Sequence, residues 1–491
     1  MFSSFSNKII IYALTVSCGV LYTSSFSPID FKFGMFLSLI IFHIILLKGH
    51  RKDNILLSYI FGLSVFGSGV SWIYNSIYNY AIQDIIISFS LTILFVLLIS
   101  LLFIPIGYFL NKDSKINYPL FPIMLPTIWV VLEFIRSNIF GGFPWLLVGT
   151  SQINTFFDYL YPLYGTKFVS FIIIYISIIF SFLFVRPRYL YIHVSLICLF
   201  LFLSLFLNLN NVIVSNKLIR IGVIQPNIDI SLKYDNEKID IIKQKYRQLL
   251  SNKTDEELII FPETAIPIIY NYDKDFYRKI ISKYNVEILS GIFRQDSDGK
   301  IYNSMVLIND FEQYYDKRQL VPFGEYTPFS NIFKPISDVL NIPMSNLSHG
   351  SPNQSDIKLL DINIYPIICY EAAYPNLLKL DYNKYGFIVN VSNDGWFGDS
   401  LAPYQHLQIA QSRALETGYP IIRSANTGIT AIINSNGKII DSLAFNTEGY
   451  IHTSIKPVKG NTFYMYFGDY PVLMLLFSLT LLHTFYLRRH G

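Results

Sequence analysis

The sequence predicts an α-helical membrane bundle joined to an α/β domain of nearly soluble composition. Charged residues make up 15% of the 491 residues, against about 25% in a typical soluble domain. They are also unevenly spread: residues 1–214 hold 17 charged side chains, or 8%, and residues 215–463 hold 52, or 21%. Residues 464–491 hold only three. We therefore expect a transmembrane domain at 1–214, a globular domain at 215–463 and a last transmembrane helix at 464–491.

The same composition excludes three other classes of protein. A chain with 52% hydrophobic residues has ample apolar surface to bury, so it is not intrinsically disordered. Its three cysteines, at positions 18, 198 and 369, are too few for a disulfide scaffold. A net charge of +4 is too weak to indicate a nucleic-acid partner, and none is expected.

Eight segments are apolar enough to span a bilayer, which takes about 20 residues. They are roughly 9–26, 31–48, 55–74, 85–110, 119–140, 168–185, 189–207 and 470–487. The first follows Lys8 as a signal peptide would, but seven further spans favour a retained helix. We therefore expect eight transmembrane helices.

Basic residues near the span ends predict the orientation. Ten lie on one side and three on the other, namely Lys8, Lys48, Arg51, Lys52, Lys112, Lys115, Arg186, Arg188, Arg488 and Arg489 against Lys32, Arg136 and Lys167. Lysine and arginine are enriched in cytoplasmic loops. We therefore expect both termini in the cytoplasm and residues 208–469 outside it.

Within residues 215–463, strand-like and helix-like stretches alternate. The strand-like stretches are 218–224, 258–261, 286–292, 362–368, 387–391, 421–424 and 429–433, and the helical ones are 236–250, 275–284 and 403–418. This alternation favours an α/β or layered α+β fold. The spacing does not decide between one sheet and two.

Three reactive side chains each follow an apolar strand of this domain. Glu263 ends the run LIIFPE, where partial burial would suit a carboxylate to act as a base; a helix N-cap or a loop carboxylate is the alternative. Lys317 precedes an apolar stretch and a Pro-Phe-Gly turn, and its alternative is a solvated charge. Cys369 ends an apolar strand and is the domain's one cysteine, so it is either a buried inert thiol or a nucleophile.

Together these side chains have the composition of a thiol enzyme's site. Thiol catalysis needs a base for the proton and a positive group beside the thiolate and the developing oxyanion. The domain's histidines, His349, His406 and His452, lie in no comparable motif, and His406 is expected to be structural. The sequence has no metal-ligand spacing, P-loop or GxGxxG motif, so we expect no metal and no cofactor.

The flanking sequences resemble a known family. The segments are FPETAIP, LVPFGEYTPF, ICYEAAYP, NVSNDGWFGDS and RSANTGITAII, with GGFPW in the membrane part. They are similar to the carbon–nitrogen hydrolase (nitrilase) superfamily and, more closely, to the apolipoprotein N-acyltransferases of diderm bacteria. The resemblance covers nearly the whole chain. It implies an αββα sandwich for the carbon–nitrogen hydrolase-like catalytic domain at 215–463.

By this resemblance, Glu263 is the general base, Lys317 the oxyanion stabiliser and Cys369 the nucleophile. Supporting positions are Glu325, Tyr370 and Glu371. Candidate lipid or substrate contacts are Trp145, Tyr234 and Trp396, and Tyr234 stands where the family usually has Trp. The apolar stretches around Phe323, Tyr326, Phe329, Trp396 and Phe397 would exclude water or touch lipid, and ordinary core and loop packing is the alternative.

The resemblance also implies a reaction and its partners. An acyl chain would pass from a membrane phospholipid to Cys369 as a thioester. It would then pass to the N-terminal amino group of a diacylglyceryl-cysteine, completing lipoprotein maturation. The partners would be the phospholipid donor, the apolipoprotein acceptor and the lipid bilayer. The location would be the bacterial inner membrane, with the catalytic domain on the periplasmic side.

Two other functions use the same sequence features differently. A membrane-tethered amidase would hydrolyse a small amide with the same three residues. A polytopic transporter or receptor would only bind ligand through residues 215–463 and would depend on polar residues within its spans. Glu133 and Arg136 are the charged pair near a span interior, and we interpret them as interfacial. The three strand-end motifs count against a transporter.

Overall fold

A computed structural model describes residues 5–79, 83–111, 118–184, 189–207, 211–233, 235–309, 311–328 and 346–490. These residues form two compact units, each built from separate stretches of chain. The helical unit comprises Met1–Tyr74, Ile86–Asn210 and Thr462–Gly491. The sheet unit comprises Asn75–Ile85 and Asn211–Asn461.

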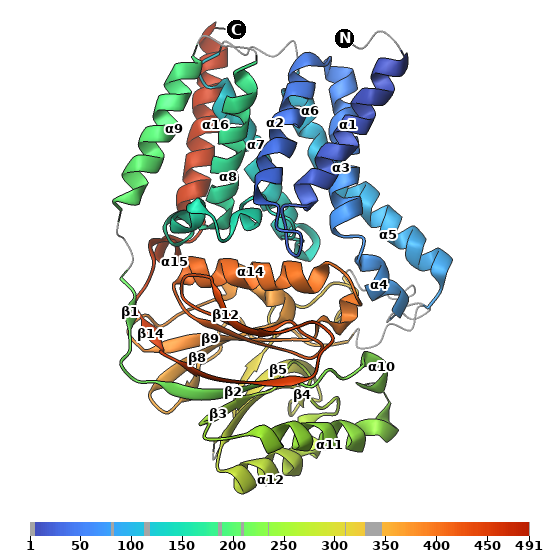
Figure 1. Cartoon of the computed structure of the whole chain (residues 1–491), viewed down its shortest axis with the longest axis vertical. Helices are drawn as coiled ribbons and strands as arrows, with labels where there is room; N and C mark the ends of the chain where they lie inside the picture. Colours follow the sequence, from blue (N-terminus) through green and yellow to red (C-terminus); the bar gives the residue numbers. More distant parts are fainter. Residues whose placement is uncertain are drawn as a thin grey trace. The chain divides into compact units, whose positions relative to one another are not determined.

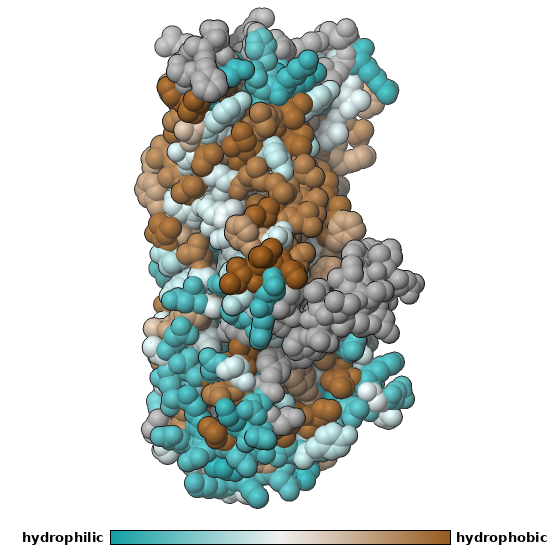
Figure 2. All heavy atoms as spheres, turned by 90° about the vertical axis from the view of Figure 1, so that its right-hand side faces the viewer, coloured by the Kyte–Doolittle hydropathy of each residue, from teal (hydrophilic) through white to brown (hydrophobic). Residues whose placement is uncertain are grey.

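The helical unit consists of apolar helices (Figure 1). They are α1 (Phe5–Thr23), α2 (Lys32–Lys48), α3 (Arg51–Gly69), α5 (Ile85–Ser100), α6 (Ile104–Phe109), α7 (Phe121–Asn138), α8 (Tyr161–Phe182), α9 (Leu190–Leu205), α15 (Phe463–Phe467) and α16 (Tyr470–His490). Apolar side chains cover much of the surface of this unit in Figure 2. On α5, for example, Ile86 is 77% exposed and Phe89 is 58% exposed. Such a surface is suited to a lipid environment.

Three helical stretches of the described residues are long and apolar enough to cross a membrane. They are Ile85–Phe109, Phe121–Gly141 and Phe156–Phe182. Shorter apolar helices are Lys8–Thr23, Leu190–Leu205 and Tyr470–Tyr486. Membrane-spanning character is therefore found, whereas the count of eight spans and the orientation stay predictions. Four of the basic residues used for orientation, Lys112, Lys115, Arg186 and Arg188, lie outside the described residues.

Two buried charged groups of the helical unit have partners within it. Glu133 and Arg136 of α7 are 3% and 9% exposed, and Glu133 Oε1 accepts a hydrogen bond from Val148 N at 2.9 Å. Lys167 of α8 forms an ion pair with Asp469 at 2.7 Å. Buried charges are tolerated when they have such partners.

Two β-sheets form the centre of the other unit. The larger contains β1 (Ile213–Val214), β7 (Ile357–Leu359), β8 (Ile362–Ile368), β9 (Gly386–Ser392), β10 (Ile421–Ala425), β11 (Thr430–Ile433), β12 (Ile439–Leu443) and β14 (Val458–Lys459). The smaller contains β13 (Gly449–Ile455), β2 (Ile219–Gln225), β3 (Leu258–Ile260), β4 (Glu287–Gln295), β5 (Ile301–Ile308) and β6 (Gln313–Asp316), in that order. In the larger sheet β8, β9 and β10 run parallel.

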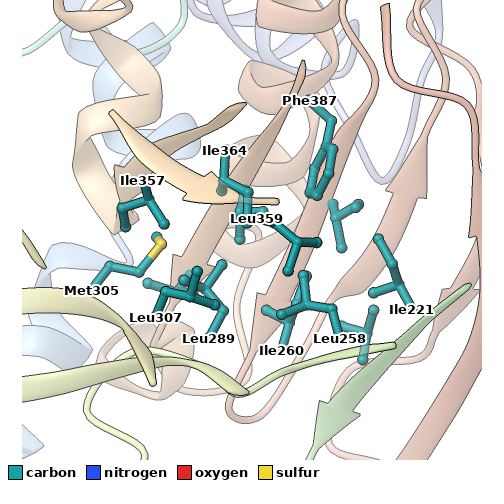
Figure 3. Close-up of a cluster of buried hydrophobic side chains, with 14 of the residues drawn as sticks. Ile221, Leu258, Ile260, Leu289, Met305, Leu307, Ile357, Leu359, Ile364 and Phe387 are labelled. Atoms are coloured by element: carbon teal, nitrogen blue, oxygen red, sulfur yellow. The ribbon is translucent and has the colours of Figure 1, made fainter. Parts of the chain in front are cut away.

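Two apolar cores hold these layers together. Figure 3 shows the core between the sheets, where Leu258, Leu289 and Met305 face Ile364 and Phe387. A second core packs the smaller sheet against α11 (Ile239–Leu249) and α12 (Lys274–Tyr284). Helix α14 (Ala402–Thr417) covers the outer face of the larger sheet (Figure 1). The αββα layering implied by the resemblance is confirmed.

The sequence located the buried strands better than the edges of the sheets. All seven predicted strands and all three predicted helices are present, and Gly418 ends α14 in the left-handed conformation. Seven strands of the two sheets were not predicted, namely β1, β5, β6, β7, β12, β13 and β14. β12 and β13 alternate or expose polar side chains, which is why they lack the continuous apolar run of a central strand.

The inter-sheet core predicts a large difference between two Leu→Ala substitutions. Leu289 is fully buried in that core, and its truncation is expected to cost about 2–5 kcal/mol through lost burial and a cavity. Leu218 is 52% exposed, so Leu218→Ala is the matched control. Thermal unfolding of the two variants in detergent measures the difference. Equal unfolding midpoints would contradict the assignment of Leu289 to the core.

Candidate active site

Strand direction brings two of the three predicted residues to one edge of the smaller sheet. β3 runs parallel to β4, β5 is antiparallel to β4, and β6 is antiparallel to β5. β6 therefore runs in the same direction as β3, because two reversals restore the direction. Glu263 follows β3 and Lys317 follows β6, so both lie at the carboxyl ends of their strands.

The Lys317 ammonium lies between two carboxylates. Its Nζ is 2.8 Å from Glu325 Oε1 and 3.4 Å from Glu263 Oε1, and the lysine side chain is 1% exposed. Burial alone would lower the pKa of Lys317, but the charges of Glu325 and then Glu263 outweigh it and hold the pKa above its usual range. Lys317 is therefore a fixed positive charge at neutral pH.

Asn303 of β5 completes this cluster, and the sequence did not reveal it. Its Nδ2 donates to Glu263 Oε1 at 2.7 Å and to Glu325 Oε1 at 2.9 Å. Glu325 Oε2 accepts a hydrogen bond from Val321 N at 2.8 Å. Among the described residues, Glu263 Oε2 is buried and has no hydrogen-bond partner. The cluster therefore presents one carboxylate oxygen that is available for a proton.

The turn that bears Glu263 is held by close packing. A Cβ on Gly291 of β4 would lie 2.5 Å from Glu263 Cα, so only glycine allows this approach. Ala265 N donates to Gly291 O at 2.9 Å, and Thr264 adopts a positive φ of 48°. These contacts place the carboxylate rigidly.

Lys233, the last residue of α10 (Ile230–Lys233), forms hydrogen bonds with the main chain of the same turn. This role was not predicted from the sequence. Lys233 is 3% exposed, and its Nζ donates to the carbonyl oxygens of Glu263 at 3.3 Å and Thr264 at 3.0 Å. Burial lowers the pKa of Lys233 from 10.5 to about 7, with Glu263 opposing the change. A lysine whose partners are carbonyl oxygens carries much of its desolvation cost uncompensated.

Cys369 follows β8 in a left-handed backbone conformation, with φ at 50°. It is 7% exposed. Burial, and then the charge of Glu263, raises the pKa of the thiol well above its usual range, while Lys317 opposes this rise. Cys369 therefore interacts electrostatically with Glu263 and with Lys317, and its resting form is the protonated thiol.

Glu371 holds the turn after Cys369 rather than facing the thiol. Its carboxylate accepts hydrogen bonds from Ile368 N at 2.8 Å, Arg318 N at 2.7 Å and the Tyr315 hydroxyl at 2.9 Å. Burial raises its pKa, and these main-chain donors limit the rise. Tyr370, the next predicted supporting residue, packs edge-to-face on Tyr374 at 5.3 Å. Glu371 therefore ties the lysine segment to the cysteine segment.

The predicted lipid contacts lie in different environments. Trp145 is 1% exposed and packs against Trp72 at 5.3 Å, so in this structure its ring contacts protein rather than lipid. Trp396 is partly exposed, and its carbonyl accepts a hydrogen bond from Ser76 Oγ at 3.0 Å. Tyr234 and Phe329 lie outside the described residues.

The other aromatic residues predicted near the site are partly exposed. Phe323 is 49% exposed, and Tyr326 packs edge-to-face on His349 at 5.0 Å. Phe397 lies 6.3 Å from the His406 ring. Their roles in excluding water or touching lipid stay predictions.

One cluster has the residue types of a metal site. Ligand atoms of Cys369, Asp394 and His406 lie within 4.8 Å of one another. Both nitrogens of His406 are already within hydrogen-bond distance of oxygen atoms, and Arg423 pairs with Asp394 at 2.5 Å. The donor set is therefore better satisfied as a hydrogen-bond network than as a cation site.

Two family models match most of the chain. The apolipoprotein N-acyltransferase N-terminal domain matches residues 18–179, and the carbon-nitrogen hydrolase domain matches residues 220–461, which include both sheets' main strands and the cluster above. The sheet unit therefore has the carbon–nitrogen hydrolase fold.

Individual relatives match over nearly the whole length. The chain is 30% identical to the apolipoprotein N-acyltransferase of Pasteurella multocida (strain Pm70), over 97% of this chain and 96% of that one. It is 33% identical to the enzyme of the same name from Coxiella burnetii (strain RSA 493 / Nine Mile phase I), over 86% and 89%. It is 32% identical to the apolipoprotein N-acyltransferase of Wigglesworthia glossinidia brevipalpis, over 93% of this chain and 94% of that one.

The buried Lys233 predicts a pH-dependent stability difference. Below about pH 7 the lysine is charged in both the folded and the unfolded chain, so the burial penalty is complete. Between about pH 7 and 10.5 the folded chain loses the proton first, so the penalty shrinks as pH rises. The unfolding midpoint of Lys233→Met minus that of the wild type should therefore be larger at pH 6 than at pH 9.

Lys300 is exposed, so Lys300→Met is the control and should change the midpoint little at either pH. Differential scanning fluorimetry in detergent measures all three proteins. A Lys233→Met difference that is the same at both pH values would show that burial does not depress the pKa of this lysine.

Proposed function

The chain belongs to the apolipoprotein N-acyltransferase family and is an acyltransferase, and we propose that Cys369 carries the acyl group as a thioester. The donor is a membrane phospholipid, and the acceptor is the free amino group of the diacylglyceryl-cysteine of an apolipoprotein. The observation that supports this most directly is the Lys317 ammonium between Glu263 and Glu325, with Glu263 Oε2 unpartnered among the described residues.

The first half-reaction begins with a protonated thiol. Glu263 accepts the Cys369 proton while the sulfur attacks the ester carbonyl carbon of the phospholipid. Lys317 stabilises the negative charge that develops on the carbonyl oxygen. The carbon–oxygen bond then breaks, and the lysophospholipid leaves with the proton that Glu263 held. Glu325 and Asn303 keep Lys317 and Glu263 in place through the hydrogen bonds described above.

The second half-reaction reuses the same groups. The acceptor amine attacks the thioester carbonyl, Glu263 takes a proton from the nitrogen, and the carbon–sulfur bond breaks. The amide is released and Cys369 regains its proton. Water would hydrolyse the thioester, and the burial of Glu263, Lys317 and Cys369 limits its access.

The proposed placement follows from both substrates being anchored by acyl chains. Eight transmembrane helices would hold the catalytic domain, residues 215–463, at the outer surface of the inner membrane, with both termini in the cytoplasm. The apolar surface of the helical unit supports a membrane location. Confinement to a surface raises the encounter rate of enzyme and lipid substrates without any further contact.

Cys369→Ala is expected to abolish the covalent acyl adduct. The purified full chain is incubated with labelled phospholipid, and the adduct is measured by intact mass and by its sensitivity to hydroxylamine. The matched control is the double variant Cys18→Ala/Cys198→Ala, which should keep the adduct, because these cysteines lie in helices of the other unit. An adduct that persists in Cys369→Ala would remove the thioester from the mechanism.

Glu263→Gln is expected to slow adduct formation by about 10²–10⁴-fold, because the thiol would lose its general base. The amide keeps the size of the side chain, so the fold should be retained. Glu312→Gln is the control, since Glu312 also pairs with a lysine, Lys274, at 2.6 Å but lies outside the cluster. Rapid-quench measurement of the acylation rate tests this. Equal rates for the two variants would exclude Glu263 as the base.

A further inference from the structure

His406 connects α14 to the main chain of the nucleophile. Its side chain is 1% exposed. Nε2 lies 3.0 Å from the carbonyl oxygen of Cys369, and Nδ1 lies 2.9 Å from Asp394 Oδ1. The sequence predicted only a structural role for this residue, and the structure places it against the reactive residue itself.

Asp394 is held as a carboxylate on the far side of the imidazole. Arg423 Nη2 lies 2.5 Å from Oδ2, and the Ser392 hydroxyl donates to Oδ1 at 2.6 Å. Burial alone would raise the pKa of Asp394, but the charges of Arg423 and His406 outweigh it and lower the pKa to about 2. Arg423 also donates to Ile429 O at 3.2 Å and to the Asn390 side chain. The His406 imidazole therefore contacts an ionised carboxylate that Arg423 holds in place.

The partners of the imidazole determine which nitrogen carries a proton. A carbonyl oxygen only accepts hydrogen bonds, so Nε2 must be protonated to bond Cys369 O. Nδ1 is 2.9 Å from the Asp394 carboxylate and 3.1 Å from Arg423 Nη2. With a proton on Nε2, the neutral ring accepts from Arg423 through Nδ1, and only the doubly protonated ring also donates to Asp394. Either arrangement leaves Nε2–H donating to Cys369.

This hydrogen bond orients a whole peptide group. The bond between residues 369 and 370 is trans and planar, so its N–H points away from the direction of its C=O. Fixing the Cys369 carbonyl oxygen on His406 therefore fixes the direction of the Tyr370 N–H. A main-chain N–H directly after a nucleophile is a recurrent donor to the oxyanion in acyl transfer. The positive φ of Cys369 also needs such external support, because a cysteine rarely adopts it.

We propose that His406, oriented by Asp394 and Arg423, is a positioning residue for acyl transfer. It holds the Cys369–Tyr370 peptide group, and with it the thiol and the Tyr370 N–H, in the geometry that attack on the acyl donor requires. This inference rests on the proposed thioester function. It adds Arg423 of β10, His406 of α14 and Asp394 of the segment after β9 to the residues that determine the acylation rate.

The test compares substitutions on one helix. His406→Leu removes the donor to Cys369 O, and His406→Gln can restore an N–H donor. Gln411→Leu is the matched control, because Gln411 is also a buried residue of α14 that donates to a distant carbonyl, Gly437 O, at 2.8 Å. The full chain is purified in detergent, its folded fraction is measured by thermal unfolding, and the Cys369 acylation rate is measured per folded molecule.

We expect His406→Leu to slow acylation by about 100-fold per folded molecule, as small misplacements of reacting groups do. His406→Gln should recover at least part of that loss, and Gln411→Leu should acylate at the wild-type rate. A merely structural role would lower the unfolding midpoint of both Leu variants and leave their rates per folded molecule equal. That result, or a Gln variant no faster than the Leu variant, would overturn the proposal.

A second substitution decides the question if His406→Leu does not fold. Asp394→Asn preserves shape and removes the charge that orients the imidazole, and it should slow acylation about 10-fold or more, whereas a wild-type rate would overturn the proposal. The acylation rates of the wild type and the variants separate an error in the proposed function from an error in the positioning role. If wild-type protein forms no Cys369 adduct, the proposed function is wrong; if the wild type and the His406 variants form it equally fast, only the positioning role is wrong.

Discussion

The burial of one ammonium group, that of Lys317, constrains the rest of the site. A lysine this deeply buried keeps its charge only with carboxylates and hydrogen-bond acceptors around it, because desolvating a charge costs several kcal/mol. Glu263 and Glu325 meet that requirement, and Asn303 holds both of them. Each comes from a different strand or loop, so the sheet must form before the charge is compensated. The site and the fold therefore stabilise one another.

The neighbouring groups follow from that arrangement. Burial, and then the charge of Glu263, raises the pKa of the Cys369 thiol and keeps it protonated, while Lys317 opposes this rise. A protonated resting thiol is protected from oxidation, since the thiolate is the reactive form. The main chain around Cys369 is held on one side by Glu371 and on the other by His406. In the proposed mechanism, this rigid placement would offset the low acidity of the thiol.

Much of the fold was predictable, because apolar periodicity and strand-end residues are local signals. Glu263 and Cys369 could be named since each follows an apolar run and carries a reactive group, and Lys317 since it precedes an apolar stretch and a Pro-Phe-Gly turn in a segment that resembles the family. Asn303 could not, because an amide inside a strand gives no signal until the opposite strand is known. Lys233 gave no signal because it lies on a short helix among polar residues. His406 was expected to be structural only, because the many polar residues of α14 do not reveal that nearly the whole helix is buried. The ring of Trp145, a candidate lipid or substrate contact, is buried and packs on Trp72, and its proposed role stays a prediction.

The sequence alone shows the change in charge density near residue 214, the family motifs and the order of the three candidate reactive residues, because composition, motifs and spacing are properties of the chain itself. The folded chain was needed to show which carboxylates share Lys317, which oxygen of Glu263 has no hydrogen-bond partner among the described residues, and what holds Cys369 O. These contacts join residues far apart in the chain, such as Lys317 and Glu263, through sheet register. Register is set by the packing of both sheets against their common core, which no local segment encodes.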